Sequence, residues 1–135
     1  MSDLAAVQRS ALLYGLSDAA AVYMLSAAVE LEIEAGSTVA QAVANDLAAY
    51  VVLEGLLELP DGRTVSDGAM LFPESLVGVS SPRLPVVKQA ARLLRIRKDD
   101  FGELCEADPR LGLQLYRRLA EHLAHAPPVG TPAAR

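Results

Sequence analysis

Residues 70–87, MLFPESLVGVSSPRLPVV, are the stretch from which the fold of this chain can best be worked out. Its ends are rich in strand-forming residues, and its middle is made of small ones. One acid and one base, Glu74 and Arg83, are close enough in sequence to face one concave site. Pro73 and Pro85 lie beside them. This composition is typical of a loop that holds an anion, or of one derived from such a loop.

Length and charge limit the function classes. The chain has 135 residues, which suits one domain, and its net charge of −5 argues against a dedicated nucleic-acid-binding protein. Its single cysteine, Cys105, cannot form an internal disulfide, as is typical of a reducing compartment. No segment approaches the ~20 apolar residues of a membrane span, and no secretory signal pattern is present. We therefore expect a cytoplasmic protein that binds neither nucleic acid nor membranes.

Strand patterns dominate the middle of the chain. Residues 29–34 alternate apolar residues with glutamates, which predicts a half-buried strand, and residues 38–44 are a second candidate strand. Residues 50–59 are the most apolar segment, and Gly55 within them indicates a β-bulge or a close approach of another backbone. The sequence PDGR at residues 60–63 predicts a hairpin connection.

Helices are predicted on both sides of these strands. Ser17 is a suitable N-cap for a helix over residues 18–28, with Val22, Leu25 and Val29 on its apolar side and Ala21 and Ala28 alongside them. After a strand at residues 92–96, helical spacing resumes and places Cys105 among apolar neighbours, as a small core residue rather than a reactive thiol. An acid and a proline then begin a last helix in the preferred way, at Asp108 and Pro109.

This outline predicts a mainly β domain with flanking helices, because several short strands separated by turns suggest a sandwich or barrel. We expect one domain over residues 1–126 and a disordered Pro/Ala-rich tail over residues 127–135. No catalytic triad, nucleotide loop or metal-ligand spacing is present, so we expect no enzyme and no metal. His122 and His125 suit the negative end of the last helix better than a metal.

A series of motifs carries a resemblance to a known family. They are LLxGLSD (12–18), EAG (34–36), YVVLxG (50–55), DGR (61–63), FxE (72–74), PR (82–83), LLRIxKDDF (93–101) and ADP (107–109). Each is weak alone, but their order and spacing are specific. Over residues 12–124 the chain resembles the cyclic-nucleotide-binding domain family, as in the regulatory half of the bacterial catabolite activator proteins. The resemblance implies a jelly-roll β-sandwich with flanking helices and a cyclic nucleotide inside the roll.

The resemblance also implies a role for residues 70–87, which would be the phosphate-binding cassette. In the family, a glutamate accepts a hydrogen bond from the ribose hydroxyl, and an arginine meets the cyclic phosphate together with backbone amides. Glu74 and Arg83 match these two positions. If the site is retained, its ligand contacts would come from Glu74, Ser75, Arg83, Leu84 and Val86.

The cassette departs from the family pattern around both charged residues. Pro73 stands where the family has glycine, so an N–H and backbone freedom are lost. After Arg83, Leu84, Pro85 and Val86 replace small and hydroxyl residues. Each lost hydrogen bond to a charged group is worth about 1.5–3 kcal/mol. Two or three such losses would weaken binding by roughly two to six orders of magnitude. Glu74 and Arg83 would then serve to hold the loop, by pairing with each other or with neighbours.

We therefore predict a non-catalytic module without a cofactor that acts by protein–protein interaction or scaffolding. The alternative is a regulatory sensor that binds cAMP, cGMP or another small anion through Arg83 and Glu74. In the resembled family the last helix pairs two subunits, so we expect a homodimer, with packing of this helix on the roll as the alternative. The predicted interface residues are Leu111, Leu115, Tyr116, Leu119 and Leu123. A helix-turn-helix would follow this helix in transcription regulators, and we expect none here because the chain ends.

Overall fold

A computed structural model describes residues 7–8, 10, 13–39, 47–79 and 85–125, including every side chain except that of His125. The elements are α2 (Asp18–Ala27), β1 (Val29–Ile33), β2 (Ala48–Glu58), β3 (Thr64–Val65), β4 (Met70–Leu71), the 3-10 helix η2 (Pro73–Val77), β5 (Val86–Arg97), α3 (Lys98–Ala107) and α4 (Pro109–His125). The predicted fold class, mainly β with flanking helices, is confirmed. The predicted tail lies outside the described residues.

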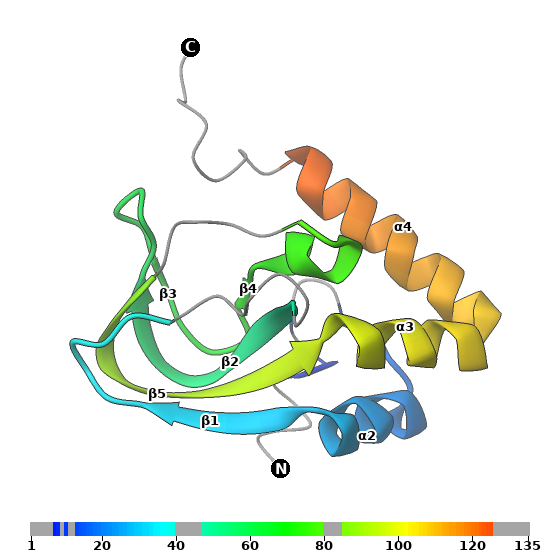
Figure 1. Ribbon diagram of the computed structural model, residues 1–135, viewed down its shortest axis with the longest axis horizontal. Helices are drawn as coiled ribbons and strands as arrows, with labels where there is room; N and C mark the ends of the chain where they lie inside the picture. Colours follow the sequence, from blue (N-terminus) through cyan, green and yellow to red (C-terminus); the bar gives the residue numbers. More distant parts are fainter. Residues whose placement is uncertain (1–6, 9, 11–12, 40–46, 80–84, 126–135) are drawn as a thin grey trace.

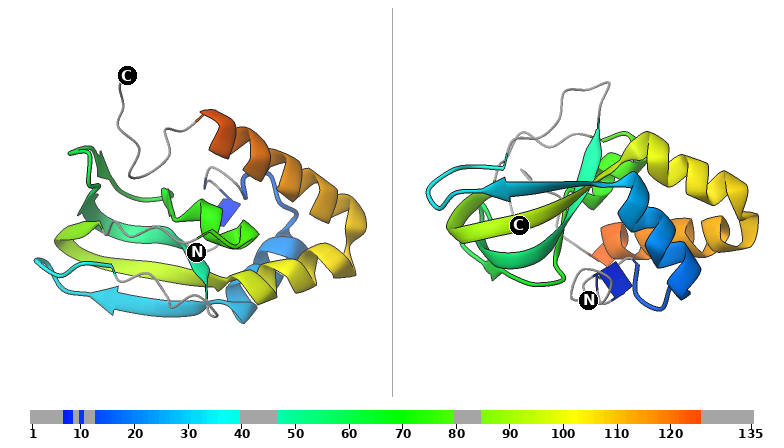
Figure 2. Two further views of the ribbon diagram at one scale, coloured as in Figure 1. Left: turned by 45° about the horizontal axis from the view of Figure 1, so that its top comes forward. Right: turned by 90° about the horizontal axis from the view of Figure 1, so that it is seen from below.

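The strands form one curled antiparallel sheet with the order β1-β5-β2-β3, and β4 pairs with β2 as well. Its two long strands, β2 and β5, lie side by side through most of their length. Figures 1 and 2 show α2, α3 and α4 grouped at one end of this sheet, with the β2–β3 hairpin at the other. The hairpin was predicted from PDGR, and the register Leu57↔Val65 and Glu58↔Thr64 confirms it.

Gly55 lets β2 and β5 approach each other closely. Its φ is +115°, and a Cβ at this position would lie 2.6 Å from the Cα of Ala91 in β5. The pairing of the two strands shifts register between Val52 and Glu54, across Gly55 between Glu54 and Leu56, and again between Leu56 and Leu57. Both predicted features of Gly55, an irregularity in the strand pairing and a close approach of another backbone, are therefore confirmed.

Alternation along β2 and β5 divides the buried side chains between two clusters. Val51 and Leu94 face the helices, in a cluster that we call the helical core. Val52 and Leu93 face the inside of the curled sheet, in a cluster that we call the roll core. The helical core includes Leu13, Met24, Leu76, Leu94, Ile96, Phe101, Leu115 and Leu119. The roll core includes Val39, Tyr50, Val52, Leu57, Leu71, Phe72, Val87 and Leu93.

The predicted cap of α2 is confirmed, and its predicted apolar side is partly right, because Ala21 is buried and Leu25 and Ala28 pack against the helical core. The Ser17 hydroxyl accepts from the N–H of Ala20 at 3.2 Å. The fully buried residues are Ala21 and Met24, whereas the side chains of Val22 and Val29 are 53% and 47% exposed. Because α2 is apolar on nearly every side, its sequence pattern could not determine which side faces the core.

The strand predicted over residues 29–34 is confirmed as β1, which pairs with β5. The second candidate strand, residues 38–44, is only partly described. Within it, Thr38 forms an isolated bridge with Val86 and Val39 is buried, while residues 40–44 lie outside the described part of the chain.

The last two helices meet at a very close contact. Asp108 caps α4 as predicted, since its Oδ1 accepts from the N–H of Leu111 at 3.3 Å. Gly112 follows, and a Cβ there would lie 2.7 Å from the carbonyl oxygen of Cys105 in α3. Cys105 is buried in the helical core, as predicted for a small core residue. The absence of a side chain at Gly112 therefore sets the distance between α3 and α4.

Candidate functional site

The segment predicted to be the phosphate-binding cassette begins at the edge of the roll core. β4 pairs with β2, with Tyr50 opposite Leu71. Phe72 follows in the left-handed conformation, with φ 56° and ψ 47°, which is unusual for a bulky residue. Its ring is buried and meets the ring of Tyr50 edge to face, with centroids 6.0 Å apart. The backbone strain at Phe72 is therefore offset by aromatic packing inside the roll.

Pro73 opens the 3-10 helix η2, at a position where a missing N–H and a fixed φ suit a helix start. The backbone amides described beyond it are used within the segment. Ser75 donates to the carbonyl of Phe72 at 3.0 Å, and Val79 donates to that of Glu74 at 3.1 Å. The N–H of Gly78 donates to the carbonyls of Glu74 and Ser75. These amides close the helix rather than converge on a common point.

Glu74 is half-buried on η2, and burial raises the pKa of its carboxyl above the ordinary value. A hydrogen bond from its own backbone N–H and the charge of His122 act in the opposite direction. His122 belongs to α4, which is in contact with η2. Sequence reasoning did not find this proximity, because no local pattern relates the two residues.

The other residues that were predicted to contact a ligand lie in different environments. Ser75 is fully buried. Val86 is half-buried at the start of β5, where it pairs with Glu58 and bridges Thr38. Arg83 and Leu84 lie outside the described residues, so their roles, and any pairing of Arg83 with Glu74, stay predictions.

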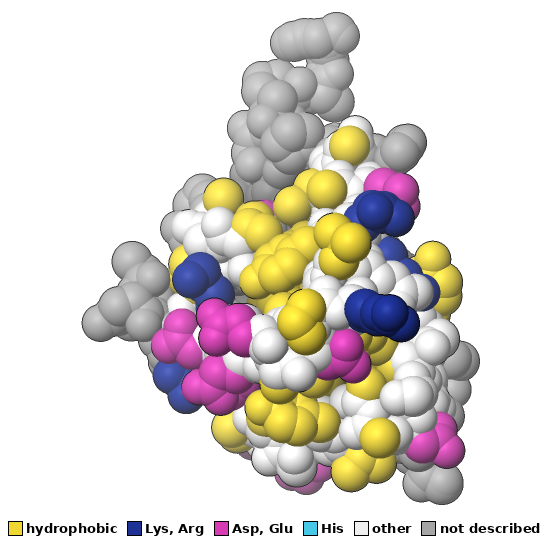
Figure 3. All heavy atoms as spheres, turned by 90° about the vertical axis from the view of Figure 1, so that its right-hand side faces the viewer, with side chains coloured by type: hydrophobic (Ala, Val, Ile, Leu, Met, Phe, Trp, Pro, Cys, Tyr) yellow, Lys and Arg dark blue, Asp and Glu magenta, His cyan; other side chains and the backbone are white. Residues whose placement is uncertain are grey.

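The residues predicted for a dimer interface on α4 do not share one exposed surface. Leu115 and Leu119 are 0% and 1% exposed and belong to the chain's own helical core. Leu111 and Leu123 are partly buried against the same core. Tyr116 is exposed, and so is Leu113, which was not among the predicted residues. Figure 3 shows hydrophobic side chains gathered on the helical end of the molecule, close to basic ones. The dimer itself stays a prediction.

Tyr116 also joins α4 to α3. Its ring meets that of Phe101 edge to face, with centroids 5.3 Å apart, and its side chain is near enough to Cys105 for each group to affect the pKa of the other. Burial is the main cause that raises the pKa of both the Cys105 thiol and the Tyr116 phenol. A raised thiol pKa disfavours the thiolate, which is the nucleophilic form, and this supports a structural role for Cys105.

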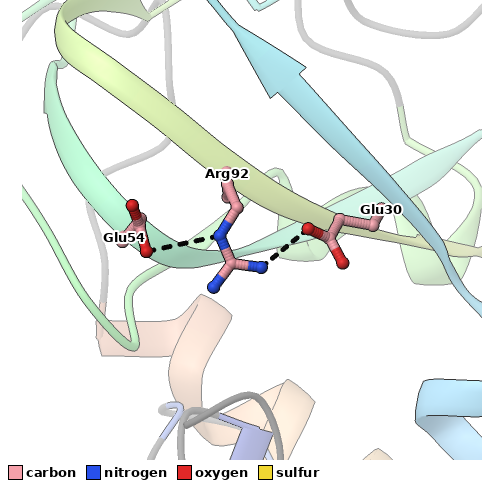
Figure 4. Close-up of polar contacts among 3 residues, drawn as sticks. All are labelled: Glu30, Glu54 and Arg92. Carbon is pink, nitrogen blue, oxygen red and sulfur yellow. Dashed lines mark hydrogen bonds and ion pairs between the residues drawn. The ribbon is translucent and has the colours of Figure 1, made fainter.

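A charged cluster on the sheet surface was not found by sequence reasoning. Arg92 of β5 lies between Glu30 of β1 and Glu54 of β2, at N–O distances of 2.6 and 3.3 Å (Figure 4). The cluster connects three neighbouring strands of the sheet. Its acids are exposed, and such ion pairs contribute about 0–1 kcal/mol each. Only the strand register brings them together, so the sequence alone carried no signal for them.

Two further findings concern the described residues alone. They contain no group of three or more His, Cys, Asp or Glu side chains that could hold a metal ion. None of their helices combines the length and the hydropathy required to cross a lipid bilayer.

Comparison with known proteins identifies the fold. No family model and no curated protein matches the sequence. Among solved structures, the N-terminal domain of a transcriptional regulator from Streptomyces coelicolor A3(2) matches with a TM-score of 0.73 at 22% identity, over 88% of this chain and 92% of that one. A cyclic nucleotide-binding domain from Methylobacillus flagellatus KT matches with a TM-score of 0.72 at 17% identity, over 91% and 75%.

A third match is a regulatory protein from Silicibacter pomeroyi DSS-3, assigned as cAMP-binding. Its TM-score is 0.70 at 20% identity, over 91% of this chain and 61% of that one. The chain thus spans less than two thirds of that structure's length. At such identities the likeness concerns the fold. The chain has the fold of the cyclic-nucleotide-binding domains, a β-sandwich with flanking helices, as the sequence resemblance implied.

Proposed function

We propose that this chain is a non-catalytic regulatory module of the cyclic-nucleotide-binding fold that acts by contacting another protein. We further propose that its cassette does not hold a cyclic nucleotide in the family's usual way. The shared fold supports the regulatory role. The structure of the cassette segment supports the second part.

The observation that carries the proposal is the use of the backbone amides around η2. Pro73 has no N–H, and the amides of Ser75, Gly78 and Val79 donate to carbonyls of the same segment. A phosphate site of this type needs amides that converge on the anion, in addition to an arginine. A ligand would therefore have to open η2 before it could recruit these donors, and Leu76 of η2 is anchored in the helical core.

Isothermal titration calorimetry with cAMP and with cGMP tests this part of the proposal. We expect no saturable heat with either nucleotide for the wild-type protein. Saturable micromolar binding that disappears in Arg83→Ala would contradict the proposal and support a nucleotide sensor instead. A thermal-shift series with cyclic mono- and dinucleotides extends the test to other cyclic ligands.

A second copy of the chain is the partner that we propose, through the exposed side of α4. Leu113 and Tyr116 are 62% and 41% exposed there, and exposed large apolar residues are typical of contact surfaces. Leu113→Glu is expected to convert a dimer to a monomer in sedimentation velocity. Gln114→Glu is the matched control, because it adds the same charge at an exposed polar position of the same helix. A wild-type protein that sediments as a monomer at every concentration would contradict the dimer.

A further inference from the structure

One edge of the sheet is formed by β1, which has a neighbouring strand on one side. The strand order is β1-β5-β2-β3, so β5 covers one side of β1. Within the described part of the chain, no strand pairs with its other side, which borders the sheet at the bottom of Figure 1. In an antiparallel pair, alternate residues direct their N–H and C=O groups away from the partner strand. The outer side of β1 is therefore a row of hydrogen-bonding groups that another extended segment can use.

β1 is regular, accessible and without the features that usually block such an edge. Its five residues pair one to one with residues 91–95 of β5, without a bulge, and they include no proline. Val29, Glu30 and Glu32 are exposed along it, and the exposed fraction of Val29 is 47%. Native sheets protect their edges with bulges, prolines or charges that point inward, and β1 has none of these.

The two faces of β1 differ in chemistry. Leu31 and Ile33 pack against the roll core, so the apolar face of the strand lies toward the inside of the curled sheet. Glu30 and Glu32 lie on the opposite face, because successive side chains of a strand alternate. A strand added at this edge therefore has to match one apolar face and one charged face.

The charged face of this edge is acidic. Arg92 lies between Glu30 and Glu54, at N–O distances of 2.6 and 3.3 Å, so one cation faces two acids (Figure 4). Glu32 is a further exposed acid on the same strand, and Glu34 follows directly after its end. The edge thus carries more negative than positive charge on the face that a partner's polar side chains would meet.

This charge makes a second copy of the chain a poor match for the edge. Two β1 strands that keep their apolar residues on one face must place glutamate opposite glutamate. When the pairing is centred on Leu31, for example, Glu30 of each copy lies opposite Glu32 of the other. Like charges directly opposite each other destabilise a strand pair. The edge therefore favours a segment of opposite charge over its own copy.

We propose that the outer edge of β1 binds an extended segment of another protein, in which basic residues alternate with apolar ones, as an added strand of the sheet. The basic side chains lie opposite Glu30 and Glu32, where cross-strand pairs of opposite charge stabilise the pairing. The apolar side chains continue the face of Leu31 and Ile33. The inference goes beyond the proposed function, because it requires neither the α4 dimer nor a cassette without nucleotide.

Fluorescence anisotropy on the full chain tests the proposal with a labelled, end-blocked peptide in which lysine and valine alternate. A length of about seven residues is enough to cover β1. We expect saturable binding of this peptide and none of its counterpart with glutamate in place of lysine. A third peptide has the same composition, with all lysines before all valines. It should bind about tenfold more weakly or less, because its charges cannot share one face of a strand.

A pair of protein variants tests the position of the site. Glu32→Lys replaces an attractive cross-strand pair by a repulsive one, so the alternating peptide should bind about tenfold more weakly. Asp67→Lys is the matched control, because it makes the same change of charge at an exposed position after β3, at the other end of the strand order. Its affinity should stay within about twofold of wild type, since salt screens distant charges. Both positions are exposed, so both variants should fold.

Amide hydrogen exchange distinguishes an added strand from general charge attraction. The alternating peptide should slow exchange at alternate amides of residues 29–33, because their outward N–H groups gain acceptors. Unchanged exchange in β1, equal binding of the two lysine peptides, or equal weakening by Glu32→Lys and Asp67→Lys would overturn the proposal. Failure of the alternating peptide to bind at all would overturn it as well, and would leave the nucleotide and dimer experiments unaffected.

Discussion

Two contacts between distant parts of the chain are built in opposite ways. At the β2–β5 contact, the backbone of Gly55 lies directly against Ala91, with no polar side chain between them. Where η2 contacts α4, η2 carries the half-buried carboxyl of Glu74, and burial raises the pKa of this group. The first contact fixes the shape of the sheet at any pH. The second includes an ionisable group in a half-buried position, so the contribution of that group to stability changes with pH.

The largest expected effect comes from breaking the first contact. Gly55→Ala combines a left-handed φ with a Cβ 2.6 Å from the Ala91 Cα. Backbone strain of about 1–3 kcal/mol and overpacking of about 1–3 kcal/mol should lower the free energy of unfolding by roughly 2–6 kcal/mol. Gly62→Ala is the control, because its φ is +93° with nothing within 4 Å of the added Cβ. The free energy of unfolding of Gly62→Ala should fall by only about 1–2 kcal/mol. If urea unfolding shows the same decrease in the free energy of unfolding for Gly55→Ala and Gly62→Ala, the close approach of β2 and β5 does not add to the cost of the substitution.

A smaller loss is expected where α3 crosses α4. Gly112→Ala places a Cβ 2.7 Å from the Cys105 carbonyl oxygen, so the two helices must separate. We expect destabilisation by about 1–3 kcal/mol, even though alanine is the better helix former. At Gly102 in α3 there is nothing within 4 Å of an added Cβ. Gly102→Ala should therefore stabilise the protein by up to about 1 kcal/mol. Thermal or urea unfolding of both variants measures these two changes in stability. A stabilised Gly112→Ala variant would contradict the close contact between α3 and α4 at Gly112.

The smallest effect concerns Glu74 and depends on pH. Because burial raises the pKa of this carboxyl in the folded state, the ionised form destabilises the native protein above that pKa. Glu74→Gln, which is neutral at every pH, should therefore raise the melting temperature at neutral and alkaline pH. The gain should shrink as the pH falls through the raised pKa of the folded protein and should vanish below about 4.3, the ordinary value for glutamate, where both states bind the proton. Melting curves of the two proteins from acidic to alkaline pH give the comparison. A gain that grows toward acidic pH would show the opposite pKa shift.

The sheet was largely predictable because its signals are local. The alternation in residues 29–34, the glycine within β2 and the PDGR turn each act over a few neighbouring residues, and all three predictions hold. The helices were predictable in position but not in orientation. α2 is apolar on most sides, and the leucines of α4 include two that its own fold buries.

The candidate site was predictable only in part, for a similar reason. Sequence motifs predicted a cassette around Glu74 with a missing donor at Pro73, and this role of the segment stays a prediction. The sequence could not show that Pro73 begins a 3-10 helix whose amides pair internally. Nor could it show that burial raises the pKa of Glu74, since the surroundings of this side chain depend on how distant elements pack against η2. Packing between elements that are distant in the sequence produces no local periodic pattern from which it could be predicted.

The central claim is that the cassette segment does not recruit its amides to a cyclic nucleotide. Titration of ¹⁵N-labelled protein with cAMP, followed at the amide signals of Ser75, Gly78 and Val79, tests it directly. We predict that these signals stay unchanged up to millimolar nucleotide. Saturable shifts at these three amides, at micromolar nucleotide, would contradict the account.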